Sequence, residues 1–263
     1  MRGFRNGRAA VLIVGIATIF TISEGPAMAD PLTIGAPPSL KGALTKILPM
    51  FEQEQGAAVQ VVYQPSKTLR QQIEQGAAID VFLAAGTADV EHLRGKGLLL
   101  NGGHRIYAQT SLVLVMPSDS PTTLVSFHDA LPNRATRIAL GDPRTSSLGE
   151  VTDQMLTKLG PAYRRHAHVL YAPHSGDIMQ LLQTGKADVG LVYRIDTIHN
   201  GQVRISDETP LGTYVPVQFG QAVVSTCREG LRPVAERFSD FLMSPRIQKL
   251  LLQHGFEPVS AHG

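Results

Sequence analysis

Four serines of this chain stand where an apolar run gives way to residues at helical spacing. The start of a helix carries backbone N–H groups without an acceptor in the helix, together with a partial positive charge, so it attracts anions. A serine hydroxyl at that place adds a further donor. A serine that only caps its helix has the same signature, so each junction alone is also consistent with an ordinary cap. The four are Ser39, Ser66, Ser147 and Ser175.

The first junction has the clearest pattern. Residues 32–44 read LTIGAPPSLKGAL, a short apolar run followed by two prolines and a serine. From Leu40 onwards, apolar residues fall at i, i+3, i+4, i+7, i+8 and i+11, which is the stripe of an amphipathic helix. The pattern predicts that Ser39 is the N-cap of a helix over Ser39–Gln55, and that Pro49 kinks or divides this helix.

The other three junctions repeat this arrangement. Ser66 precedes a helical run that closes at Gly76, and Ser175 precedes another. Ser147 and Glu150 have the S-x-x-E spacing of a capping box. Because ligands of α/β proteins bind at the carboxyl ends of strands, we hypothesise that the four junctions converge on one cleft.

The elements that would position these serines alternate along the chain. Strands are expected at Leu32–Ala36, Ala58–Tyr63, Asp80–Ala84, Ser111–Met116, Arg137–Leu140, His168–Ala172, Ala187–Tyr193 and Gln218–Ser225. Helices are expected at Ser39–Gln55, Lys67–Glu74, Thr87–Arg94, Leu148–Leu159, Gly176–Thr184, Arg232–Met243 and Pro245–Gln253. This alternation predicts an α/β fold of open sheets with helices on both faces.

Two long extended runs, at residues 105–117 and 216–225, indicate how the chain is divided. One run that leads out and one that returns are what two lobes with a double crossover require. We therefore expect lobe 1 to combine residues 30–109 with 219–263, and lobe 2 to comprise residues 110–218.

The first 29 residues have the pattern of a signal peptide. Three arginines precede the apolar run Ala9–Ile22, and Ala27-Met28-Ala29 offers small residues at the positions that signal peptidase reads. The apolar run is too short to span a bilayer comfortably. We expect residues 1–29 to be removed and the chain from Asp30 to be a soluble periplasmic protein. No cysteine lies at this cleavage point, so we expect no lipid anchor there.

Export changes the charge balance. The whole chain has 24 Lys and Arg against 22 Asp and Glu, and loss of three arginines and Glu24 leaves 21 of each. A neutral protein is not expected to bind nucleic acid or an anionic membrane. Cys227 is the only cysteine, so no intramolecular disulfide is possible.

Catalytic signatures are missing from the sequence. It has neither G-x-S-x-G nor H-E-x-x-H. An exported hydrolase using His174 and Ser175 is the alternative from another class, although adjacent residues rarely face one another. The ligand-sensing domain of a transcription regulator would share a two-lobed fold, but a signal peptide argues against it. We expect no catalytic residue and no bound metal cation.

Several segments resemble the periplasmic molybdate-binding proteins of ABC uptake systems. Spread in the same order over nearly all of residues 31–258, they read APPSLKGAL, SKTLRQQIEQGAAIDVFLAAG, RIALGDP, GKADVGLVY and FLMSPRIQKLLLQHGFEP. The resemblance implies a two-lobed periplasmic-binding-protein fold of type II, in which each lobe is an open sheet flanked by helices. It also implies a monomer that captures molybdate or tungstate, needs no cofactor, and delivers its ligand to an ABC permease.

The resemblance further implies which residues hold the oxyanion. Ser39 and Ser66 would donate from hydroxyl and amide groups in lobe 1. Leu148 and Ser175 would donate backbone N–H groups in lobe 2, and Tyr193 would donate its phenol. A fully deprotonated dianion accepts such bonds and has no proton to donate. Protonated phosphate would be disfavoured, because no carboxylate accepts its proton.

At the same junctions the chain departs from this family. Pro37-Pro38 stands before the first serine, and Lys67, Arg144 and His174 lie near a site that is usually uncharged. If these three basic residues are solvated, the oxyanion assignment stands. If they point inward, sulfate or a larger organic anion becomes the alternative ligand.

Overall fold

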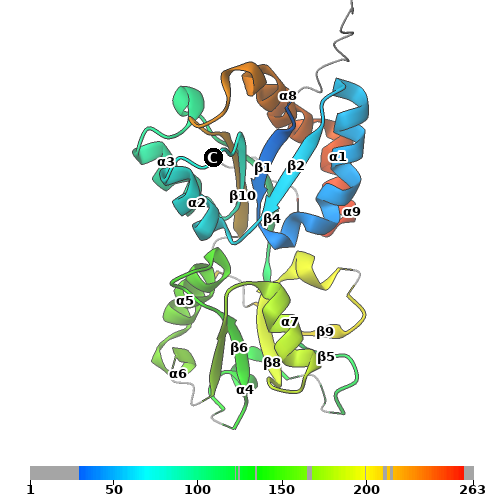
Figure 1. Ribbon diagram of the computed structural model, residues 1–263. Coiled ribbons are helices and arrows are strands. Elements are labelled where there is room, and N and C mark those ends of the chain that lie inside the picture. The colour runs from blue at the N-terminus through cyan, green and yellow to red at the C-terminus, as the bar shows by residue number, and fades with distance from the viewer. Residues whose placement is uncertain are drawn as a thin grey trace, which may run out of the picture.

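The computed structural model describes residues 30–257, apart from gaps at residues 122, 124, 134, 165–167, 199, 210–211 and 214–215. The expected signal peptide, residues 1–29, lies outside the described residues. Within the described part of the chain, two five-stranded sheets form two lobes that lie one above the other in Figure 1.

The sheet of the first lobe is mixed. Its strands, in spatial order, are β2 (Val59–Tyr63), β1 (Leu32–Ala36), β3 (Val81–Ala85), β10 (Val217–Val223) and β4 (Arg105–Thr110). β1 is parallel to both of its neighbours, whereas β10 is antiparallel to β3 and β4. β1 and β3 are buried at every position, as expected for strands with both faces covered.

Helices cover both faces of this sheet (Figure 1). One face carries α1 (Lys41–Gln55), α8 (Arg232–Met243) and α9 (Pro245–Gln253). The other face carries α2 (Ser66–Glu74) and α3 (Ala88–Gly95). α1 and α8 are joined through Phe51, whose ring lies 5.1 Å from that of Phe238 and 5.3 Å from that of Phe241.

The second lobe has the same plan. Its strands, in spatial order, are β7 (Val169–Ala172), β6 (Ile138–Gly141), β8 (Val189–Tyr193), β5 (Leu112–Pro117) and β9 (Val203–Glu208). Its helices are α4 (Phe127–Ala130), α5 (Ser147–Leu159), α6 (Pro161–Arg164) and α7 (Ser175–Gln183). Short 3₁₀ turns complete the two lobes: η1 (Pro38–Leu40), η2 (Leu100–Gly102), η3 (Arg194–Thr197) and η4 (Glu229–Leu231).

The chain passes between the sheets twice. It leaves the first sheet at Ser111, between β4 and β5, so the extended run at residues 105–117 is two strands of different sheets. It returns between β9 and β10, and β10 begins at Val217, two residues before the expected boundary. β9, in which only Val203 is buried, was not predicted from the sequence.

The predicted α/β architecture of two open sheets flanked by helices is confirmed. Both sheets are mixed, because the strands next to the crossovers run against their neighbours. β10 is antiparallel to β3, and β5 is antiparallel to β8.

Two predictions about the first helix are wrong. Ser39 is not an N-cap but lies inside the turn η1, which leads into α1, and no side chain caps either element. Proline at the first position of this turn has the φ angle that a helix start requires. Pro49 does not divide α1, which is continuous. Because Pro49 lies on the exposed side, water can bond the carbonyl that it leaves without a partner.

The predicted capping box at Ser147 and Glu150 is also wrong. Ser146 is the N-cap of α5, and its Oγ accepts a hydrogen bond of 3.1 Å from the N–H of Gly149. Ser147 is the first residue of the helix, just as Ser66 and Ser175 are the first residues of α2 and α7.

Backbone packing between β6 and α5 fixes where α5 begins. A Cβ atom on Gly141 would lie 2.6 Å from the backbone nitrogen of Gly149, and one on Gly149 would lie 2.4 Å from the carbonyl carbon of Asp142. Only glycine therefore allows the first turn of α5 to rest directly on the end of the strand. This contact places residues 146–148 at the carboxyl end of β6.

We expect Gly149→Ala to destabilise the protein by about 1–3 kcal/mol, because the new methyl group overpacks this contact. Gly95→Ala, in the last turn of α3, is the control, since no atom lies within 4 Å of its new Cβ. The control should be neutral or stabilising because alanine favours helices. Urea denaturation measures both variants, and equal stabilities would contradict the close packing.

Candidate functional site

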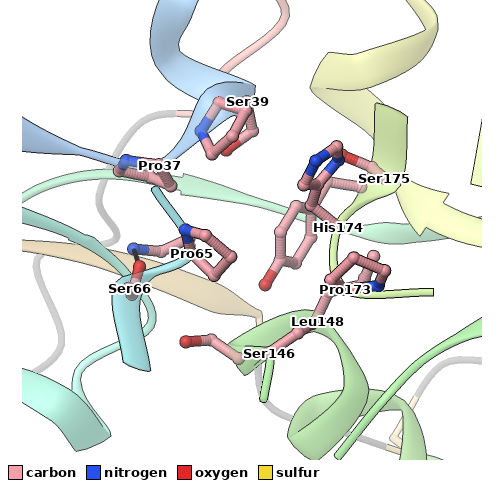
Figure 2. A pocket seen from close by; sticks show the side chains of 13 residues that line it. Pro37, Ser39, Pro65, Ser66, Ser146, Leu148, Pro173, His174 and Ser175 are labelled. Carbon is pink, nitrogen blue, oxygen red and sulfur yellow. Dashed lines mark hydrogen bonds between the residues drawn. The ribbon is translucent and has the colours of Figure 1, made fainter. Parts of the chain in front are cut away.

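A cavity of about 30 Å³ lies where the two lobes meet (Figure 2). Five of the residues that line it are those singled out from the sequence: Ser39, Ser66, Leu148, Ser175 and Tyr193. The other lining residues are Pro37, Pro38, Pro65, Ala85, Ser146, Ser147, Pro173 and His174. The structure thus brings the four serine junctions together around one cavity.

The lining comes from the carboxyl ends of strands in both lobes. β1 and β2 lead to the junctions of Ser39 and Ser66, whereas β6 and β7 lead to those of Ser147 and Ser175. Two more parallel strands, β3 and β8, end close to the same cavity. The edges at which α/β sheets bind ligands therefore face each other across it.

The hydroxyl groups of Ser39, Ser66 and Tyr193 are available to a ligand in this cavity. The Oγ of Ser66 accepts a hydrogen bond of 2.9 Å from the N–H of Ala85, which leaves the hydroxyl proton of Ser66 free to be donated. The hydroxyls of Ser39 and Tyr193 are buried and have no hydrogen-bond partner among the described residues. Buried polar atoms without a partner are rare, so these two hydroxyls fit a cavity that holds an acceptor.

Tyr193 is suited to donate. Burial raises the pKa of its phenol well above the usual value, and the negative charges of Asp196, Asp89 and Glu150 raise this pKa further. Its ring packs against Phe219, at 5.9 Å between centroids, which fixes the direction of the hydroxyl. The phenol therefore keeps its proton at neutral pH and is a fixed donor.

Backbone N–H groups add to the hydroxyls. α2, α5 and α7 all begin at the cavity, and the N–H groups of a first turn have no acceptor within their helix. At α5 the N-cap Ser146 satisfies the N–H of Gly149. That arrangement leaves the N–H groups of Ser147 and Leu148, which both line the cavity, for a ligand.

Basic residues near the cavity have partners of their own. Arg144 is 83% exposed in its side chain and donates to Asp142 at 2.8 Å. The Nε2 of His174 lies 3.2 Å from the Oδ2 of Asp177, whereas its Nδ1 is buried and has no hydrogen-bond partner among the described residues. Lys67 is held by Glu150 at 2.5 Å. Within the described part of the chain, the three basic residues that depart from the family pattern therefore add no uncompensated positive charge to the cavity.

The sequence matches a family model, described as bacterial extracellular solute-binding protein, over residues 32–257. The chain belongs to this family. The match covers both sheets, and the resemblance noted in the sequence is thereby confirmed.

Individual relatives of this solute-binding protein agree. YvgL of Bacillus subtilis (strain 168), provisionally named as an ABC transporter substrate-binding lipoprotein, is 28% identical over 226 residues, covering 86% of this chain and 85% of YvgL. The molybdate-binding protein ModA of Escherichia coli (strain K12) is 27% identical over 256 residues, covering 93% of this chain and 96% of ModA. Among solved structures, the periplasmic molybdate-binding protein of Azotobacter vinelandii is 23% identical, with a TM-score of 0.74 over 87% of this chain and 100% of that one. The expected two-lobed periplasmic-binding-protein fold is thus confirmed.

Polar contacts join the two lobes of this solute-binding protein beside the cavity. Lys67 on α2 reaches across to lobe 2, where its Nζ lies 2.5 Å from the Oε1 of Glu150 and 3.0 Å from the carbonyl oxygen of Pro143. The Oγ of Ser147 on α5 donates to the Oδ2 of Asp89 on α3 at 2.9 Å. Arg70 holds the other oxygen of Asp89 at 2.8 Å. These bonds favour the closed arrangement of the lobes.

Sequence reasoning missed several of these residues. The pair Ser146-Ser147 was the available signal for the N-cap, because the first of two adjacent serines can cap while the second begins the helix. No local pattern marks Ala85 or Asp89. Their roles arise from contacts with Ser66 and Ser147, which lie 19 and 58 residues away along the chain.

We expect Lys67→Met to shift the protein towards an open arrangement of the lobes, since a partly exposed ion pair contributes up to about 1 kcal/mol. Small-angle X-ray scattering of the ligand-free protein should then give a larger radius of gyration. Lys96→Met is the control, because it removes an ion pair with Glu74 inside lobe 1, 2.8 Å long. An unchanged radius for Lys67→Met would mean that this pair does not hold the lobes together.

Proposed function

We propose that this protein is a periplasmic solute-binding protein that captures a tetrahedral oxyanion, molybdate or tungstate, and delivers it to the permease of an ABC importer. The observation that carries the proposal is the lining of the cavity. Hydroxyl and N–H donors from both lobes surround a space of about 30 Å³, and each basic side chain nearby has its own partner.

Such a lining suits a dianion that only accepts hydrogen bonds. A hydrogen bond to a charged acceptor contributes roughly 1.5–3 kcal/mol, so several together supply the affinity without a cation. Protonated phosphate would bring a donor, and no carboxylate is among the lining residues that the structure describes. The size of the cavity favours a small anion over a larger organic one.

The remaining parts of the proposal concern location and partners. The pattern of residues 1–29 supports export to the periplasm through a cleaved signal peptide. We propose that the chain acts there as a monomer. None of the described helices is long and apolar enough to cross a membrane. In this proposal the protein needs no cofactor and catalyses no reaction, in agreement with a family of solute-binding proteins.

Thermal unfolding in the presence of molybdate, tungstate, sulfate or phosphate tests this function. A ligand at about 100 times its dissociation constant adds roughly 2.7 kcal/mol to the free energy of unfolding, which raises the melting temperature. We expect molybdate and tungstate to raise it and phosphate to leave it unchanged. A shift with sulfate alone would assign the site to that ion, and no shift with any of the four would contradict the oxyanion function.

The double variant Ser39→Ala with Ser66→Ala tests the first-lobe donors. Loss of two bonds to a charged acceptor should weaken molybdate binding by on the order of a hundredfold or more, measured by calorimetry. Ser118→Ala with Ser225→Ala, two exposed serines, is the matched control and should bind as the wild type does. Unchanged affinity in the first variant would show that these serines are not ligands.

A further inference from the structure

A second cavity adjoins the first. It has a volume of about 250 Å³ and shares the wall formed by Pro38 and Ser39. Its other lining residues are Gly42, Ala43, Ile195, Asp196, Ile198, His254 and Phe256. The residue of interest is Asp196, which lies in η3 three positions after Tyr193. Its Oδ2 atom is fully buried and has no hydrogen-bond partner among the described residues.

Asp196 lies next to two residues of the candidate site, on the side of the second cavity. The side chain of Ser175 and the backbone of Tyr193 lie close enough to its carboxyl group to lower the pKa of that group. Both residues also line the first cavity. A charge on Asp196 would therefore act directly on an anion that these two residues hold.

The charge of Asp196 is not balanced by a lysine or arginine of the described residues that line the second cavity. No lysine or arginine lines the second cavity within the described part of the chain, and His254 is its one other ionisable lining residue. Arg194, two residues away, bonds to Glu208 and Ser111 instead.

The other carboxylates near Tyr193 are different in this respect. Asp89 is paired with Arg70, and Glu150 is paired with Lys67. Burial raises the pKa of Asp196 to about 7, although Ser175 and Tyr193 act to lower it. At neutral pH this carboxyl group therefore exists in both protonation states.

We propose that Asp196 is a positioning residue that takes up a proton when the oxyanion binds, so that the protein captures the anion together with a proton. The inference rests on the proposed function. A dianion held by Ser175 and Tyr193 would repel the Asp196 carboxylate, which lies next to both residues with no lysine or arginine between. Protonation removes the repulsion and gives the buried oxygen a hydrogen to donate.

The sign of the pH dependence follows from this linkage. Below about pH 7, Asp196 already carries its proton and the affinity is constant. Above that pH, binding must recruit a proton, so the dissociation constant rises by up to about tenfold per pH unit. The other titratable groups that face the region are Tyr193, His254, His174 and Asp177.

Isothermal titration calorimetry of the wild-type protein with molybdate at pH 6, 7, 8 and 9 tests the proposal. Each titration is repeated in two buffers of different ionisation enthalpy, which gives the number of protons taken up. We expect almost none at pH 6 and up to about one at pH 8. Binding without proton uptake at pH 8 would overturn the proposal and leave the proposed function intact. No molybdate binding at any pH would instead contradict the function itself.

Three variants assign the proton to a residue. Asp196→Asn should remove both the uptake and the pH dependence, whereas Asp188→Asn, an acid just before the start of β8, should keep both. His174→Gln should also keep the pH dependence. If His174→Gln abolishes it, or if Asp196→Asn retains it, Asp196 is not the group concerned. Should Asp196→Asn fail to fold, the wild-type proton count decides alone.

Discussion

Backbone N–H groups at the start of a helix need an acceptor, and this protein places several such starts around one small cavity. η1 with α1, and α2, enter from the first lobe, while α5 and α7 enter from the second. Each start follows a parallel strand, so the requirement is met only if the two sheets present their carboxyl ends to each other. The double crossover of the chain makes this orientation possible, since it joins two similar sheets through β4–β5 and β9–β10.

Charge is arranged to keep this cavity neutral. Three basic side chains near the hydrogen-bond donors are each paired with a carboxylate of the protein, which leaves none of them for a ligand. They are Lys67, Arg70 and Arg144. Neutral donors discriminate by geometry and by the protonation state of the anion, whereas a free cation would attract any anion. The ion pair of Lys67 with Glu150 also joins the two lobes. The same interaction therefore neutralises a charge and holds the cavity closed.

Much of this architecture was predictable, and the errors have physical causes. Alternating apolar runs predicted where the central strands lie along the chain, because burial on both faces leaves a continuous apolar pattern in sequence. β9 was missed because its side chains are only partly buried. The shifts at Ser39 and Ser147 arose because a serine can cap a helix or begin it, and its local sequence is the same in both cases. The cross-lobe roles of Asp89 and Lys67 depend on contacts that no local pattern records.

Prolines that precede three of the serine junctions have a role in the same geometry. Pro38 and Pro65 stand directly before Ser39 and Ser66, and Pro173 stands two residues before Ser175. Proline has no N–H group and a fixed φ angle, so at these places it removes no useful donor and restrains the backbone before the donors begin. A restrained donor loses less conformational entropy on binding. The prolines therefore favour ordered donor groups around the cavity.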